Sequence, residues 1–296
     1  PAAAPISDPS FGSHFDDFGN YKVVLLGDGS HGTSEFYAAR AGNNQAAHRA
    51  AWAHDGGLEA DWPTLRPSIA TSASVPALRR AFGGKARDLR ALQRPLGWTN
   101  PPRTGWPPLR GMEDCERGVL QMLRDLLDKR LQYAQHDVRD GEEFHSGEQN
   151  AFVVRDAERY YKAMYYSSAS SWTLRDTHMF DTLRRLFRHK PADAKAIVWA
   201  HNSHCGDARY TSMGTRRKEV NIGQLIRENF GRENVAILGC GTHTGTVAAA
   251  HEWDEDMQVM KVRPSRDDSW EIIAHDTGIP NFVIDLRKEH LDPALR

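Results

Sequence analysis

Short apolar runs bounded by polar turns recur along the chain. Runs of this length and composition are typical of strands buried in a sheet. The first two are YKVVLL and AKAIVWA. The pattern predicts strands over residues 21–26, 194–200, 235–240, 257–262 and 281–286.

Between these runs, apolar side chains recur every three or four residues, which is the spacing of one helix face. Cys115, Val119 and Leu123 follow this period. Strands that alternate with helices predict an α/β fold, with a mainly parallel sheet flanked by helices and a helical portion over 112–190. The predicted helices cover residues 34–40, 112–131, 146–165, 174–187 and 221–230.

The segment 42–110 follows neither pattern. It contains eight of the fifteen prolines, and from Trp62 to Arg110 it has nine Lys or Arg residues against one acidic residue. Because these charges lack helical or strand spacing, a solvated insert is favoured over a face that binds polyanions. We interpret residues 1–296 as a single α/β domain that contains this poorly patterned or divergent segment.

Composition narrows the range of partners. The net charge is -1 and the pI is about 7.1, so no global field favours nucleic acid or a membrane surface. No apolar run has the length of a membrane span, and the opening PAAAPISDPS lacks the pattern of a secretory signal. The three cysteines have no CxxC spacing, which fits a reducing compartment. We therefore expect a cytoplasmic protein with neither a nucleic-acid nor a membrane partner; its oligomeric state stays open.

Three predicted strands lead into polar turns that contain histidine. The turns are DGSHG (28–32), HNSH (201–204) and GTHTG (241–245). In open α/β sheets, ligands bind beyond the carboxyl ends of the strands, so we expect these turns to meet at one pocket. The glycines of the third turn also suit a backbone nest for an anion, which makes His243 and Thr244 candidates for substrate binding.

Ser30 has two interpretations. The nucleophile elbow of serine hydrolases reads G-x-S-x-G between a strand and a helix. Here Asp28 replaces the first glycine, although the strand–turn–helix context is right. We favour the alternative, in which Ser30 is a turn residue or a helix N-cap.

The histidines allow three roles. With Asp28 and Glu59, the residues His31, His201 and His204 would complete a shell for zinc or manganese. Without a metal, neutral imidazoles serve as general base and oxyanion partner. A purely structural role is the third. We favour the reading without a cofactor and keep a divalent metal at the three histidines as the alternative.

One predicted helix begins close to Arg175 and Asp176. Arg175 suits contact with a carboxylate or with a developing oxyanion, since its guanidinium is a fixed fork of donors. Asp176 suits the positive end of the helix dipole, and it is also a candidate for substrate binding.

Seven segments together resemble the erythromycin esterase family. In chain order they are GDGSHGTSEFYAAR, EADWP, NAFVVRDAERYYKAM, SWTLRDTHM, AIVWAHNSHCGDAR, NIGQLIRENFG and GTHTGTVAAAHEW. The resemblance covers residues 21–41 and 112–287. It implies an α/β fold with helical elaboration, and ester hydrolysis without a serine nucleophile.

The resemblance also implies roles for single residues. His31 matches the proposed general base of the family, and Asp28 stands where the family has a longer carboxylate. Two departures accompany these matches: the segment before Leu58 does not look like a strand, and an aromatic-rich segment beyond it is absent. Further matches are Arg40, Glu59, the H-N-x-H pair His201 and His204, and the pair Arg175 and Asp176.

Together, these observations predict a hydrolase that opens a carboxylic ester or macrolactone, with macrolides and antibiotic resistance as the implied setting. His31 would take a proton from water, while Asp28 or Glu59 orients its ring. Arg175 would orient a carboxylate of the site. The alternatives are a metal-dependent hydrolase that uses the same cluster and a non-catalytic protein that binds a small molecule. The expected oxyanion stabilisers are His201, His204 and Arg40.

Overall fold

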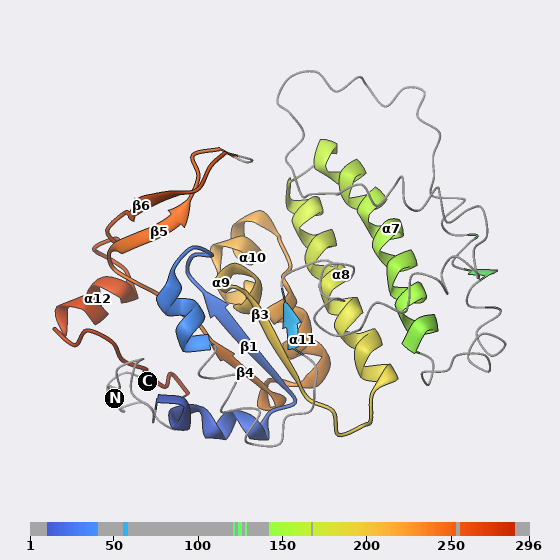
Figure 1. Cartoon of the computed structure of the whole chain (residues 1–296), viewed down its shortest axis with the longest axis horizontal. Helices are drawn as coiled ribbons and strands as arrows, with labels where there is room; N and C mark the ends of the chain where they lie inside the picture. Colours follow the sequence, from blue (N-terminus) through green and yellow to red (C-terminus); the bar gives the residue numbers. More distant parts are fainter. Residues whose placement is uncertain are drawn as a thin grey trace.

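A four-stranded parallel sheet forms the centre of the fold (Figure 1). Its strands are β1 (Val23–Asp28), β2 (Gly56–Leu58), β3 (Ala196–His201) and β4 (Val235–Leu238). They lie in the order β2-β3-β1-β4, so β1 pairs with β3 on one side and with β4 on the other. The predicted α/β class with a mainly parallel sheet is confirmed.

The computed structural model describes residues 11–40, 56–58, 121, 124–125, 128, 142–166, 168–252 and 255–287. Most of 42–110, Glu59 included, lies outside these residues, and so does most of the predicted helix 112–131. The described part of that helix is helical, and Gln121 Nε2 donates a hydrogen bond to Asp125 Oδ1 over 2.7 Å. The prediction of a single domain stays a prediction.

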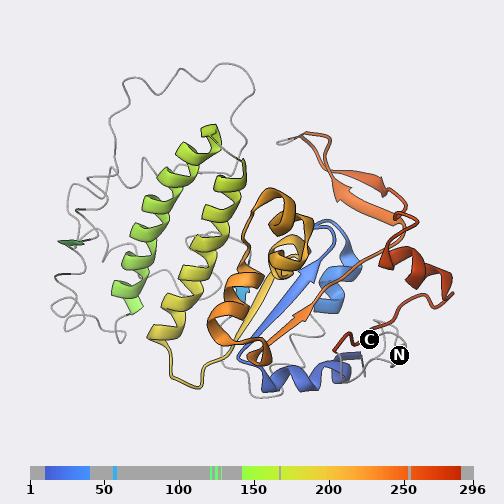
Figure 2. The ribbon, with the colours of Figure 1, turned by 180° about the vertical axis from the view of Figure 1, so that it is seen from behind.

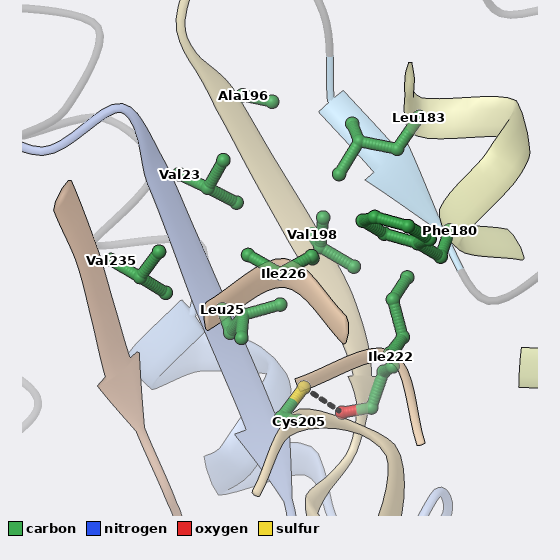
Figure 3. Packing of buried hydrophobic residues seen from close by; sticks show 11 residues of the cluster. Val23, Leu25, Phe180, Leu183, Ala196, Val198, Cys205, Ile222, Ile226 and Val235 are labelled. Carbon is green, nitrogen blue, oxygen red and sulfur yellow. Dashed lines mark hydrogen bonds between the residues drawn. The ribbon is translucent and has the colours of Figure 1, made fainter. Parts of the chain in front are cut away.

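β1 is buried along its whole length because layers cover both faces of the sheet. Val23 and Leu25 point to the same face, as alternate residues of a strand do. There they join a cluster with side chains of two helices, α8 (Ser168–His189) and α11 (Ile222–Phe230) (Figure 3). This cluster is the larger part of the core.

The other face of β1 carries Val24 and Leu26. Both residues pack with Phe18 of the 3-10 helix η1 (Phe11–Asn20), whose aromatic rings contact one another edge to face. Trp199 of β3 packs against the same cluster. The sheet is therefore the middle layer of three.

The helices predicted over 146–165, 174–187 and 221–230 are confirmed, with longer bounds for the first two. α7 (Glu142–Tyr166) and α8 pack side by side on one flank of the sheet (Figure 1). None of the helices in the described ranges combines the length and apolar character needed to cross a membrane. The other helical segments described are 34–40, α9 (Asn202–Cys205), η3 (Ala208–Tyr210), α10 (Ser212–Arg217), η4 (Arg232–Asn234) and α12 (Trp270–Asp276).

Two of the predicted strands do not belong to the central sheet: one lies in a separate hairpin, and the other is not a strand. The run 257–262 does form a strand, β6 (Gln258–Val262), but it pairs antiparallel with β5 (Gly245–Ala249), which the pattern did not predict. Figure 2 shows this hairpin and α12 on the side of the sheet opposite α7 and α8. The run 281–286 has no regular structure: Val283 packs against a core cluster, while Ile284 and Leu286 are 44% and 57% exposed.

The segment before Glu59 also differs from the prediction, because it does contain a strand. Gly56, Gly57 and Leu58 pair with β3 as the edge strand β2. Two of its three residues are glycine, so no apolar pattern marks it in the sequence. The strand ends one residue before Glu59, at the same edge of the sheet as the ends of β1 and β3.

An asparagine side chain joins the ends of three strands. Asn202 Nδ2 donates to the Cys240 carbonyl over 2.6 Å, and the Cys240 N–H donates to Asn202 Oδ1 over 3.3 Å. The amide reaches from the end of β3 to the end of β4 by crossing β1 at Gly27. A Cβ on Gly27 would lie 2.3 Å from Asn202 Oδ1 and 3.1 Å from the Leu238 carbonyl. The crossing therefore requires glycine at this position.

We expect Gly27→Ala to destabilise the protein by about 1–3 kcal/mol, because the new methyl group displaces the Asn202 amide and breaks its two hydrogen bonds. The matched control is Gly239→Ala, whose Cβ would meet Asn202 Oδ1 at 3.6 Å, an ordinary contact. Urea unfolding of both variants measures the difference. Equal stability of the two variants would mean that the Asn202 amide does not require glycine at position 27.

Candidate active site

A buried ion pair stands at the carboxyl end of the central strand. Asp28 is the last residue of β1, is fully buried, and lies in register beside His201 of β3. Arg40 Nη2 lies 2.7 Å from Asp28 Oδ2. The Arg40 guanidinium lies over the rings of Tyr37 and Trp199, with distances of 4.7 and 4.8 Å to the ring centres. Helix 34–40 thus supplies the counter-charge that a buried carboxylate needs.

The position of Arg40 changes its predicted role. Its side chain is 3% exposed and directed at Asp28, which does not fit direct stabilisation of an oxyanion. This geometry favours a positioning role for Arg40 through Asp28, and its part in catalysis stays a prediction. The same two charges act on Cys240, whose thiol pKa is raised to about 11, chiefly by burial.

His31 lies in the turn directly after Asp28. Its Nδ1 is 3.4 Å from Asp28 Oδ1, and its side chain is 60% exposed. The Tyr37 hydroxyl donates to the His31 carbonyl over 2.6 Å, and this bond holds the turn against helix 34–40. A carboxylate beside Nδ1 favours the tautomer with the proton on Nδ1 and the lone pair on Nε2.

Gly32 fixes the other side of this turn. The Ala248 N–H of β5 donates to the Gly32 carbonyl over 2.9 Å, and a Cβ on Gly32 would lie 2.0 Å from the Ala248 carbonyl oxygen. Ser30 Oγ accepts the Gly32 N–H at 3.4 Å, which is the behaviour of a turn residue. The C-terminal hairpin therefore packs directly on the segment that carries His31.

His201 has the complementary tautomer. It caps α9, and its Nδ1 accepts the Ser203 N–H at 3.2 Å, with Ser203 Oγ at 2.9 Å. An accepting Nδ1 places the proton of the neutral ring on Nε2. The His31 and His201 rings lie edge to face with centroids 5.3 Å apart. One imidazole thus has its lone pair on Nε2, and its neighbour has an N–H there.

His204 is held differently from the other two histidines. It is buried, and its Nδ1 lies 2.8 and 2.9 Å from the two Asp176 oxygens. Its ring stacks on Trp172 at 4.5 Å, and Arg175 Nη1 lies 3.3 Å from Nε2. Because arginine only donates, Nε2 accepts there, so His204 in this arrangement does not fit the predicted role of oxyanion donor. Arg175 contacts this imidazole, and its charge also lowers the pKa of the Asp176 carboxylate, so its predicted role beside a carboxylate stays a prediction.

Asp176 connects α8 to the rest of the site. It is fully buried, and besides His204 it accepts the Ile222 N–H at the start of α11 over 2.9 Å. Burial raises the pKa of Asp176, although the hydrogen bonds from His204 and Ile222 oppose this. A buried carboxylate with both oxygens engaged does not fit the predicted contact with substrate. Asp176 positions His204.

His243 and Thr244 follow β4, on the connection to β5. His243 Nδ1 lies 2.8 Å from Ser265 Oγ, and its ring stacks on His275 of α12 at 4.0 Å. Thr244 is exposed, and its carbonyl accepts the Thr242 hydroxyl. The structure thus places His243 against the C-terminal segment, and the substrate-binding role of both residues stays a prediction.

The described side chains do not form a metal site. Among them, no group of three or more His, Cys, Asp or Glu residues converges as metal ligands would. His204 does not fit a ligand, because a guanidinium faces its Nε2 and a carboxylate faces its Nδ1. Glu59, which completes the predicted ligand set, lies outside the described residues.

Two residues of the site were missed in the sequence. Asn202 lies inside the HNSH motif, between the two histidines, and Trp172 lies one turn before Asp176. Their position beside candidate residues was the only signal, since asparagine and tryptophan have many structural roles. Their contacts across strands and helices depend on the tertiary structure.

The sequence model of the erythromycin esterase family matches residues 44–296. The chain belongs to the erythromycin esterase family. The matched segment begins after Asp28, His31 and Arg40, so the match does not include these three residues.

Three solved structures share this fold. A succinoglycan biosynthesis protein gives a TM-score of 0.65 at 14% identity, over 94% of this chain and 79% of that one. A histidine-to-asparagine variant of the erythromycin esterase EreC, in its open conformation, gives 0.62 at 15% identity, over 89% and 81%. A protein from Bacillus cereus gives 0.59 at 14%, over 91% and 77%. At such low identity, these likenesses show the fold alone.

Removal of the Arg40 charge should destabilise the fold strongly. We expect Arg40→Met to lower the free energy of unfolding by about 3–5 kcal/mol, because it leaves the Asp28 carboxylate buried without its counter-charge. The double variant Arg40→Met with Asp28→Asn should regain a large part of this loss. Urea unfolding of the wild type, the single variant and the double variant measures these changes in the free energy of unfolding. A single variant as stable as wild type would mean that the pair contributes nothing.

Proposed function

We propose that the protein is a hydrolase that cleaves a carboxylic ester or macrolactone with water activated by His31. The observation that carries the proposal is the pair of complementary imidazoles at the ends of β1 and β3. The Asp28 contact favours a lone pair on Nε2 of His31, and the Ser203 contact favours an N–H on Nε2 of His201. A base beside a hydrogen-bond donor is what the addition of water to an ester carbonyl requires.

The reaction follows from these two rings. His31 Nε2 takes a proton as the water oxygen attacks the carbonyl carbon, and His201 Nε2–H donates to the oxyanion that forms. Asp28 stabilises the imidazolium. When the tetrahedral intermediate collapses, the C–O bond to the leaving group breaks and His31 returns its proton to that oxygen. The products are a carboxylic acid and an alcohol, which remain in one molecule when the substrate is a lactone.

Family membership supports a small ester or lactone as substrate, with macrolides the class that the family name gives. We assign Arg175 to the wall of the site, where it holds His204 in its buried orientation. Glu59 keeps its proposed role of orienting the His31 ring, as the family resemblance implies. A cytoplasmic location remains part of this proposal.

The general base has a direct test. His31→Asn should lower kcat/KM on an activated ester or a macrolide by about 100- to 10,000-fold, the usual contribution of general acid–base catalysis. Thermal stability should change little, because the His31 side chain is largely exposed. His251→Asn, at an exposed turn, is the control and should retain full activity. If His31→Asn keeps the rate or melts much earlier than wild type, His31 is a structural turn residue.

We propose hydrolysis without a metal, and chelation separates the two mechanisms. Dialysis against a chelator should leave kcat unchanged, because a neutral imidazole and an N–H donor suffice for the steps above. The assay compares chelated protein with protein to which zinc or manganese has been returned. Activity that disappears on chelation and returns with one divalent ion would establish the metal-dependent alternative. A protein that binds lactones without turnover would be the non-catalytic alternative.

A further inference from the structure

A cavity lined by arginine lies between α7 and α8, away from the candidate active site. Its volume is about 220 Å³. Arg175, beside the active-site histidine His204, and Arg185, in the cavity, are ten residues apart on α8, about 15 Å along a helix axis. The residues that line the cavity are Phe152 and Arg155 of α7, and Asp181, Arg184, Arg185 and Arg188 of α8.

Two of these arginines share one aromatic ring. Arg185 lies over Phe152 at 4.1 Å and Arg155 over the same ring at 4.8 Å. Such stacking holds both guanidinium planes in fixed positions without consuming their N–H groups. Two like charges are therefore kept close together at the wall of the cavity.

The carboxylates nearby neutralise only part of this charge. Arg155 forms two hydrogen bonds to Asp156, at 2.6 and 2.7 Å. Burial works against ionisation of Asp156, but hydrogen bonds from His178 and Arg155 outweigh it and hold the pKa at about 2. Arg184 and Asp181 are 3.5 Å apart. Arg155 and Arg184 are thus each paired with one carboxylate.

The other two arginines lack such a partner among the described side chains. Arg185 donates to neutral acceptors, with Nε on Gln149 Oε1 at 2.7 Å and Nη2 on Thr182 Oγ1 at 2.8 Å. Burial lowers the pKa of Arg185 to about 10; the charges of Asp181 and Asp156 oppose this effect, and the neighbouring Arg155 adds to it. Arg188 is exposed and makes no ion pair within the described residues. An anion in the cavity would relieve the excess positive charge.

We propose that this cavity is a binding site for a phosphate group, either free phosphate or the phosphate of a small monoester. A tetrahedral dianion accepts hydrogen bonds from several guanidinium forks at once, which a single carboxylate does not do. Phe152 supplies the apolar part of the cavity wall. The site is independent of the proposed hydrolysis, since it uses the opposite end of α8.

The test measures binding to the full chain by titration calorimetry and by thermal unfolding at constant ionic strength. Inorganic phosphate and glycerol phosphate should each bind saturably and raise Tm, since a ligand that binds only the folded state stabilises it. Tighter binding of glycerol phosphate would identify a phosphomonoester as the ligand, and equal binding would identify free phosphate. Binding only to vesicles that contain phosphatidic acid would overturn the cavity site in favour of a membrane surface.

Arg188→Gln should weaken phosphate binding by about tenfold, the effect of one lost charge-assisted hydrogen bond. This variant keeps the fold intact because Arg188 is exposed; Arg185→Gln should weaken binding further. The matched control is Arg216→Gln, an exposed arginine in the last turn of α10, which should bind like wild type. Absence of saturable binding, or equal weakening by Arg188→Gln and Arg216→Gln, would overturn the proposal.

Discussion

The ion pair between Asp28 and Arg40 is the interaction on which the site depends. A carboxylate at the end of the central strand is fully buried, and the 2.7 Å contact with Arg40 supplies the charge that makes this burial tolerable. The pair binds helix 34–40 to the sheet and fixes the direction of the turn that follows β1. Because His31 stands in that turn, the orientation of its ring follows from a contact made elsewhere in the fold.

Around this pair, the histidines separate into two kinds. His31 and His201 face each other at the ends of neighbouring strands, and backbone and carboxylate contacts set opposite tautomers for them. His204 is a buried ring between Trp172, Asp176 and Arg175. His204 joins α9 to α8, and Asp176 extends the connection to α11 through the Ile222 N–H.

The α7–α8 pair has an electrostatic character of its own. Its arginines gather at the end of α8 farthest from His204, where aromatic stacking and partial burial hold their charges together. Asp156 and Asp181 pair with two of these arginines, and the positive charge that remains is costly in free energy, a cost that a bound anion reduces. The two halves of α8 thus differ in chemistry: Trp172, Arg175 and Asp176 contact His204, and Arg184, Arg185 and Arg188 line the cavity.

The sequence by itself determined the α/β class, the core strands, three helices and the histidine-bearing turns, because apolar periodicity and the carboxyl-end rule for parallel sheets are local properties. It did not reveal β2, whose glycines carry no pattern, or the exposed hairpin of β5 and β6. Only the tertiary structure decided which candidates touch. Asp176 and Arg40 are buried and position other groups, because burial and partners depend on how distant segments pack, and no spacing along the chain records that.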